Sequence, residues 1–117
     1  MLLDSGASHT CIPAKYAEFF GHNNTDKRVK PIEAHGIGGK TAGFKHTLKL
    51  EMISPTGNML SKLISPWKSP NVSVWFLEKM DMEMGIIGRD VISMWQSLRF
   101  SPIKSGNKLS WAIEISI

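Results

Sequence analysis

The stretch that decides the fold reads Met1-Leu2-Leu3-Asp4-Ser5-Gly6-Ala7-Ser8. Its leucines predict a short buried strand that ends at Asp4, where an ionised carboxylate is costly unless a partner stabilises it. Ser5 supplies a small hydroxyl and Gly6 a backbone that adopts positive φ easily, so we expect a tight turn whose donors face the carboxylate. A plain strand that ends in an Asx turn explains the same residues.

Two later stretches favour a functional interpretation of that turn. The first predicts the tip of a glycine-rich hairpin and reads Ile32-Glu33-Ala34-His35-Gly36-Ile37-Gly38-Gly39-Lys40-Thr41. The second predicts an apolar strand that runs through glycine into the start of a helix, and it reads Met84-Gly85-Ile86-Ile87-Gly88-Arg89-Asp90-Val91-Ile92. Three motifs in one order and spacing are far more specific than any of them alone.

Taken in this order, the three stretches resemble the retroviral aspartic proteases, the retropepsins, from Leu2 to about Ile92. The resemblance implies an all-β fold, a retropepsin-like half-barrel with a flap hairpin and one short C-terminal helix. It also implies an origin in a retrovirus, an endogenous retrovirus or an LTR retrotransposon. Members of the family have strands ahead of the catalytic loop, so we expect this chain to be truncated at its N-terminus or assigned to an internal Met.

Length and composition favour a single domain over residues 1–117. Hydrophobic residues make up 42% and charged residues 21%, and the formal net charge is +4. The local basic group at residues 26–30 has no interleaved aromatic side chains, which favours a solvated loop over a nucleic-acid contact. Apolar runs are far shorter than the roughly 20 residues that span a bilayer, so we expect no membrane partner.

Cysteine and histidine usage argues against metal chemistry. Cys11 is the only cysteine, which excludes an internal disulfide and suits a reducing compartment. It lies between Thr10 and Ile12, and we interpret it as a small buried hydrophobe rather than a nucleophile. The histidines lack zinc-ligand spacing, so we expect no metal; they are His9, His22, His35 and His46.

The hydrophobic pattern between the motifs predicts mostly strands. We expect a brief helix over Pro13–Phe20 that Gly21 ends, and a half-buried strand over Thr41–Ile53 after the glycine-rich tip. Next come a turn over Ser54–Asn58, a strand over Met59–Ile64, a proline-bounded insert over Ser65–Pro70, a strand with Val72, Val74 and Phe76, and a helix over Arg89–Gln96.

The last predicted element is a hairpin from Leu98 to Ile117 with a turn over Lys104–Lys108. Its second strand carries large apolar residues at every second position: Leu109, Trp111, Ile113, Ile115 and Ile117. A strand this apolar promotes aggregation when it is left in water, so we expect it to pair with another chain.

The chemistry of an aspartic peptidase requires two carboxylates that share a proton, one as a base toward water and one as an acid toward the carbonyl oxygen. The chain has one Asp-Ser-Gly loop, so we expect a homodimer that acts on a peptide or polyprotein substrate. The resemblance places Asp4 of each subunit on the two-fold axis. Because water is the nucleophile, no metal or other cofactor is implied.

The resemblance also implies roles for the other motif residues. Ser5, Gly6 and Ala7 support the catalytic loop, and Met84 and Ile86 form pockets for apolar substrate side chains. The flap that covers the substrate consists of His35, Gly36, Ile37, Gly38 and Gly39. The competing interpretation of His35 is a histidine of the hairpin that faces solvent. The competing interpretation of Ile86 and its neighbour Ile87 is a plain core strand. Ile87 and Gly88 are expected behind the loop.

One position departs from the family. Many members carry an acid two residues after the loop glycine, where this chain has Ser8. Arg89 therefore lacks its expected ion-pair partner, and either Asp90 or hydrogen bonds to loop carbonyls could replace it.

The leading hypothesis is a homodimeric aspartic endopeptidase that cleaves a viral or retrotransposon polyprotein at extended, largely apolar sites. It would act in the virion or the host cytoplasm, as part of the polyprotein before its release. One alternative is a catalytically inactive fragment or binding domain that keeps the fold. Another is a cellular retropepsin-like protease of the ubiquitin pathway; the flap and the Gly-Arg-Asp junction favour the viral branch.

Overall fold

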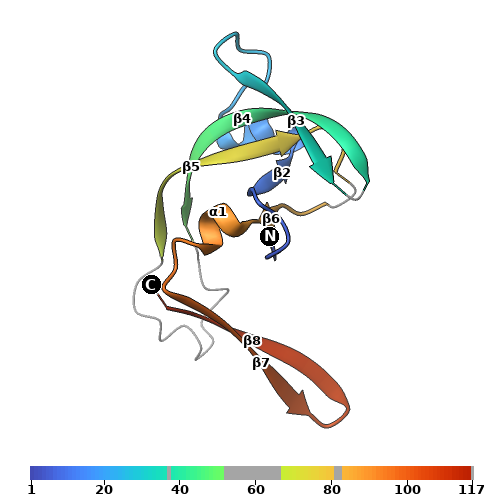
Figure 1. Ribbon diagram of the computed structural model, residues 1–117, viewed down its shortest axis with the longest axis vertical. Coiled ribbons are helices and arrows are strands. Elements are labelled where there is room, and N and C mark those ends of the chain that lie inside the picture. The colour runs from blue at the N-terminus through green and yellow to red at the C-terminus, as the bar shows by residue number, and fades with distance from the viewer. Residues whose placement is uncertain (37, 52–66, 81–82, 117) are drawn as a thin grey trace.

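The computed structural model describes residues 1–36, 38–51, 67–80 and 83–116. Most of them lie in strands that form a six-stranded sheet and a separate two-stranded hairpin (Figure 1). This arrangement, with one short α-helix in the described residues, confirms the predicted all-β class. The expectations for Ile37, the Ser54–Asn58 turn and the Met59–Ile64 strand lie outside the described residues. Neither helix in the described part has the length and apolarity of a membrane span.

The six-stranded sheet contains all three motifs. Its strand order is β1 (Leu2–Leu3), β6 (Ile86–Ile87), β2 (Cys11–Pro13), β5 (Lys68–Leu77), β4 (Gly39–Glu51) and β3 (Lys30–Gly36). Strand β1 pairs in parallel with β6, so the first motif lies directly beside the third. Because β1 is an edge strand, Leu2 is 46% exposed, and the expectation of a buried strand before Asp4 is wrong for this residue.

The glycine-rich stretch forms the predicted hairpin. Strands β3 and β4 pair in antiparallel fashion up to the Gly36–Gly39 pair. Gly39 has φ +99°, a conformation that residues with a side chain rarely adopt. Beyond the tip, β4 is half-buried as predicted: the side chains of Lys45, Lys49 and Glu51 are exposed on one face while His46 on the other is buried.

Strand β5 begins earlier than the sequence predicts. Lys68, Ser69 and Pro70 already belong to it, so the expected insert is wrong for these residues. The register of β4 against β5 shifts between Lys49 and Glu51. At this bulge the Ser69 hydroxyl accepts a hydrogen bond from the Leu50 N–H at 2.7 Å, so this N–H has a partner where the register is irregular.

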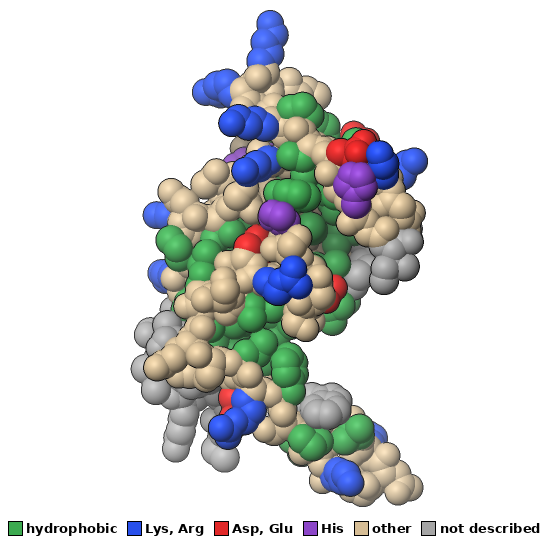
Figure 2. Space-filling model, viewed as in Figure 1, with side chains coloured by type: hydrophobic (Ala, Val, Ile, Leu, Met, Phe, Trp, Pro, Cys, Tyr) green, Lys and Arg blue, Asp and Glu red, His purple; other side chains and the backbone are tan. Residues whose placement is uncertain are grey.

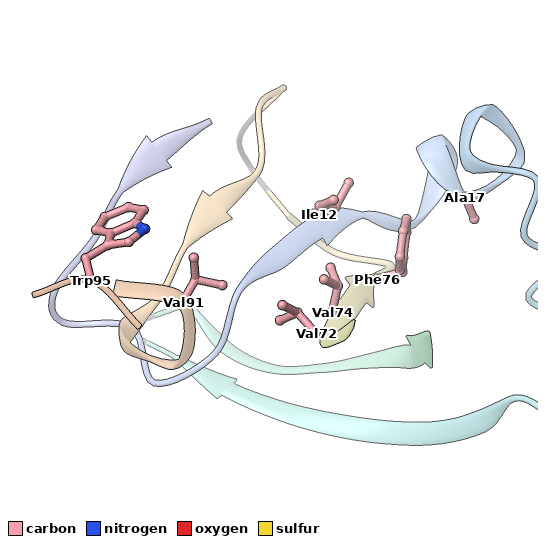
Figure 3. Close-up of a cluster of buried hydrophobic side chains, with 7 residues drawn as sticks. All are labelled: Ile12, Ala17, Val72, Val74, Phe76, Val91 and Trp95. Atoms are coloured by element: carbon pink, nitrogen blue, oxygen red, sulfur yellow. The ribbon is translucent and has the colours of Figure 1, made fainter. Parts of the chain in front are cut away.

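The core lies between β5 and the elements that pack on it (Figure 3). Its buried side chains come from β2, β5, the 3₁₀ helix η1 (Ala14–Phe20) and the segment that begins with α1 (Arg89–Ile92): they are Ile12, Ala17, Val72, Val74, Phe76, Val91 and Trp95. Phe76 and Val74 are completely buried, as the alternation in β5 predicts.

Both helices differ from their predicted form. The segment after Pro13 is a 3₁₀ helix, and Gly21 ends it in the left-handed conformation as expected. Helix α1 stops at Ile92 instead of Gln96. The reason is that the Gln96 N–H donates to the Ser116 carbonyl at 2.8 Å, which draws the backbone into a contact with the C-terminal hairpin.

That hairpin consists of β7 (Ser97–Ser105) and β8 (Lys108–Ser116), and it projects from the rest of the molecule (Figure 1). Its turn contains Gly106 at φ +60°, where a turn was predicted. Hydrophobic side chains are visible along the projecting arm (Figure 2). Leu98 and Ile115, at the base of the hairpin, pack against the core.

Candidate active site

The loop after β1 fixes the carboxylate of Asp4. The Asp4 N–H donates to the Ile87 carbonyl at 3.0 Å, which joins the start of the loop to β6. The Gly6 N–H then donates to Asp4 Oδ1 at 2.8 Å, so a loop donor does face the carboxylate as expected. Gly6 does not have positive φ, and that expectation is wrong. Instead, a Cβ at position 6 would lie 3.1 Å from Asp4 Oδ1, so close approach explains the glycine.

Arg89 supports the same loop from α1. Its Nη1 donates to the Ser5 carbonyl at 3.1 Å and to the Gly6 carbonyl at 3.4 Å. Its backbone N–H donates to the Ala7 carbonyl at 2.9 Å. Of the two substitutes for the absent acid at Ser8, the structure therefore selects the loop carbonyls. All three loop-support residues are held by this one arginine.

Asp90 has a different partner. Its carboxylate accepts hydrogen bonds from the Thr10 N–H at 2.9 Å and the Thr10 hydroxyl at 2.7 Å. The hydroxyl oxygen accepts in turn from the Gly88 N–H at 3.1 Å. A Cβ at Gly88 would lie 2.5 Å from the His9 carbonyl carbon, so only glycine fits behind the loop. Thr10 is completely buried, and no sequence motif indicated a role for it.

A cleft of about 780 Å³ separates the loop from the flap. Most of the predicted site residues line it: Asp4, Gly6, Ala7, His35, Gly36, Gly38, Gly39 and Ile86. The structure thus places Asp4 and the tip of the glycine-rich hairpin in the lining of one cavity. A cleft of this form suits an extended chain whose backbone can meet the strand edges of the flap.

Met84 does not lie with the other predicted pocket residue. It lines a separate cavity of about 400 Å³ with Met1, Phe19 and other apolar residues. Residues 83 and 84 form a bend ahead of β6, so the strand alternation that orients Ile86 does not extend to Met84. Ser5 also lies outside the cleft lining, and it contributes through its carbonyl.

The cleft contains residues that the sequence analysis missed. His9 stacks on Trp75 with ring centroids 3.9 Å apart and an interplanar angle of 18°. Both residues line the cleft, and His9 Nδ1 lies 2.8 Å from the Ser8 hydroxyl. The alternation in β5 offered a signal for Trp75, because it places this residue opposite to the buried Val74 and Phe76. Thr41, Leu77, Lys79 and Met80 complete this part of the lining.

His35 lies beside a carboxylate, and Cys11 is a poor nucleophile. His35 is exposed, and its Nε2 lies 3.0 Å from Glu33 Oε1. Cys11 is half-buried, and its thiol donates to the His9 carbonyl at 3.3 Å. Burial, and to a lesser extent the charge of Asp90, raises the pKa of the Cys11 thiol to about 11, which disfavours the nucleophilic thiolate. Among the described residues, no three side chains of the metal-binding types gather into one group.

Comparisons with known proteins agree with this geometry. The family model described as aspartyl protease matches residues 1–91, which include the loop, the flap and the start of α1. Searches of curated proteins and of solved structures found no match.

Proposed function

Because the chain belongs to the aspartyl protease family, we propose that it is a retropepsin-type endopeptidase that works as a homodimer. The observation that carries the proposal is the shared cleft, whose lining contains both Asp4 and the glycine tip of the flap. A single Asp4 per chain cannot supply both an acid and a base. A second copy related by a two-fold axis would supply the other carboxylate.

In the proposed dimer, the two Asp4 carboxylates share one proton and hold a water molecule between them. The ionised carboxylate takes a proton from the water as it attacks the peptide carbonyl, and the protonated one donates to the carbonyl oxygen. When the tetrahedral intermediate collapses, a proton passes to the leaving amine. In each chain the Gly6 N–H fixes one oxygen of the carboxylate and Arg89 fixes the loop carbonyls, so little reorganisation accompanies the reaction.

The substrate that fits this cleft is an extended polypeptide with apolar side chains near the cleaved bond. Trp75, Leu77, Met80 and Ile86 provide apolar surface in the lining. The flap backbone near Gly38 and Gly39 supplies donors and acceptors for the substrate main chain. A polyprotein of a retrovirus or retrotransposon, processed in the virion or the host cytoplasm, has this character, and the flap and the Gly-Arg-Asp junction favour that origin.

The C-terminal hairpin supplies a candidate dimer surface. Phe100 of β7 lies opposite Ile113 of β8, so their side chains share one face of the hairpin. They are 51% and 47% exposed. Leu109, at the same face, is 59% exposed. Large apolar groups together on a projecting arm favour association with a second copy.

A peptide-cleavage assay tests the function. We expect cleavage that pepstatin inhibits and that Asp4→Asn abolishes, because asparagine cannot act as base or acid. Asp26→Asn is the matched control: it removes a surface carboxylate that pairs with Arg28 at 2.8 Å, and activity should persist. Cleavage that survives Asp4→Asn would contradict the proposal. Peptide binding without cleavage in the unmodified chain would favour the binding-domain alternative.

A further inference from the structure

The cleft has an unequal distribution of charge. Asp4 is the only acidic residue in its described lining, whereas Lys40 and Lys79 are basic and His9 and His35 can donate hydrogen bonds. A peptidase that acts only on apolar sequences has no need for two lysines at its substrate cleft. The two lysines therefore raise the question of which substrate group they contact.

Hydrogen bonds hold Lys79 at the wall of the cleft. Its backbone N–H donates to the Thr41 hydroxyl at 2.9 Å. The Glu78 N–H donates to the Ala42 carbonyl at 3.0 Å. These two bonds fix residues 78 and 79 along the descending strand of the flap. The backbone that carries the Lys79 side chain is thus held in place by hydrogen bonds.

The two lysines differ in their partners. Lys40 Nζ lies 3.3 Å from Glu33 Oε1, an oxygen that also lies 3.0 Å from His35 Nε2. Glu33 therefore offsets much of the positive charge at the flap tip. Lys79 has no carboxylate within 4 Å among the residues that the structure describes. Lys79 therefore places in the cleft lining a charge that no described carboxylate offsets.

We propose that this cleft selects peptides with an acidic side chain close to the cleaved bond, which Lys79 recognises by charge. The inference rests on the proposed peptidase function and names its substrate class more closely. Trp75, Leu77, Met80 and Ile86 contact the apolar residues of the substrate, while the lysine at the wall pairs with a carboxylate of a flanking residue. The attraction is stronger in a partly enclosed cleft than in bulk water.

The test uses peptides that differ at one flanking position, with glutamate, glutamine or lysine there. With the unmodified dimer we expect kcat/KM for the glutamate peptide to exceed that for the glutamine peptide about two- to fivefold, as for a partly exposed ion pair. The ratio should fall as salt is added, because salt screens the attraction. Equal values for the two peptides at every flanking position would overturn the inference.

Variants assign the effect to Lys79. Lys79→Glu should reverse the preference toward the lysine peptide, and Lys79→Gln should make kcat/KM equal for the glutamate and glutamine peptides. Lys27→Glu is the control, because it makes the same charge change on an exposed loop outside the cleft. A preference that Lys79→Glu and Lys79→Gln leave intact would overturn the assignment.

Binding separates this inference from the peptidase function. Fluorescence anisotropy of the same peptides on the Asp4→Asn protein measures the charge preference without turnover. If the unmodified chain cleaves nothing but the Asp4→Asn protein still binds the glutamate peptide more tightly, the peptidase function fails and the acidic preference stands. If the unmodified chain cleaves peptides without regard to their charge, only the acidic preference fails.

Discussion

The carboxylate of Asp90 accepts two hydrogen bonds from Thr10, one from its N–H at 2.9 Å and one from its hydroxyl at 2.7 Å. This contact joins the start of β2 to α1 across 80 positions of sequence. Since Asp90 is engaged with Thr10, Arg89 is left to bind the carbonyls of the loop that follows Asp4. Arg89 and Asp90, which are adjacent and of opposite charge, thus bind the loop after Asp4 and the segment before β2, respectively.

The Thr10 hydroxyl should matter for stability. Thr10→Val keeps the shape but leaves the Gly88 N–H and one oxygen of Asp90 without this partner, which costs about 1–3 kcal/mol of unfolding free energy. Urea unfolding followed by circular dichroism measures it. Thr25→Val is the control, because the Thr25 hydroxyl donates to Asn23 at the surface. Equal stabilities of the two variants would show that the buried contact is dispensable.

The flap tip depends on Gly39. Gly39→Val introduces a side chain at φ +99°, with a local cost of roughly 1–3 kcal/mol. Turnover should fall more than global stability, because the strain lies in the segment that we propose to cover the substrate. Gly36→Val is the matched control, since Gly36 is not among the described glycines with positive φ and a Cβ there meets nothing within 4 Å. Identical kinetic constants for the two variants would argue against a strained tip.

His46 should make the fold sensitive to acid. Its Nε2 lies 2.7 Å from Asn24 Oδ1, an acceptor, so the proton sits on Nε2 and Nδ1 accepts from His22 Nδ1 at 3.1 Å. Burial, and then the proximity of His22, lowers the pKa of His46 below its usual 6.5. The unfolded chain therefore binds more protons as the pH drops below 6.5, and the stability that neutral His46 provides is lost in that range.

Urea midpoints between pH 7.5 and 5 check this expectation. His46→Gln should be less stable at neutral pH, because it disturbs the contacts with His22 and Asn24, and its stability should decline less with acid. His35→Gln is the control, since it removes an exposed histidine of the flap hairpin and leaves the contacts of His46 in place. An unaltered slope in His46→Gln would assign the acid sensitivity to other groups.

The apolar face of the C-terminal hairpin, which carries Phe100, Leu109 and Ile113, should govern dimerisation. Ile113→Ser removes a large apolar group that would contribute roughly 1.5–3 kcal/mol when fully buried between two copies. Sedimentation should then show a weaker dimer, and peptidase activity should fall at low protein concentration. Ile103→Ser is a close control: Ile103 is 45% exposed, compared with 47% for Ile113, but it points to the opposite face of the hairpin. Equal dimer affinities would place the interface elsewhere.

Local motifs could be predicted from the sequence, and contacts between distant strands could not. The Asp4 turn and the flap follow from nearby residues, because a short hydroxyl and glycines favour tight turns in any context. The His9–Trp75 stack depends on the parallel pairing of β2 with β5, in which Cys11 lies opposite Trp75, and no local pattern encodes that register. Helix α1 was overestimated for the same reason, since the bond from Gln96 to Ser116 is a long-range contact.

The most direct test of the central claim is to mix unmodified protein with Asp4→Asn protein after joint unfolding and refolding. If each active site needs Asp4 from two chains, activity per total protein should follow the square of the unmodified fraction. An equal mixture would then retain about one quarter of the activity, because random pairing makes one dimer in four fully unmodified. Activity that falls in direct proportion to the unmodified fraction would show that each chain works alone, and it would contradict the shared site.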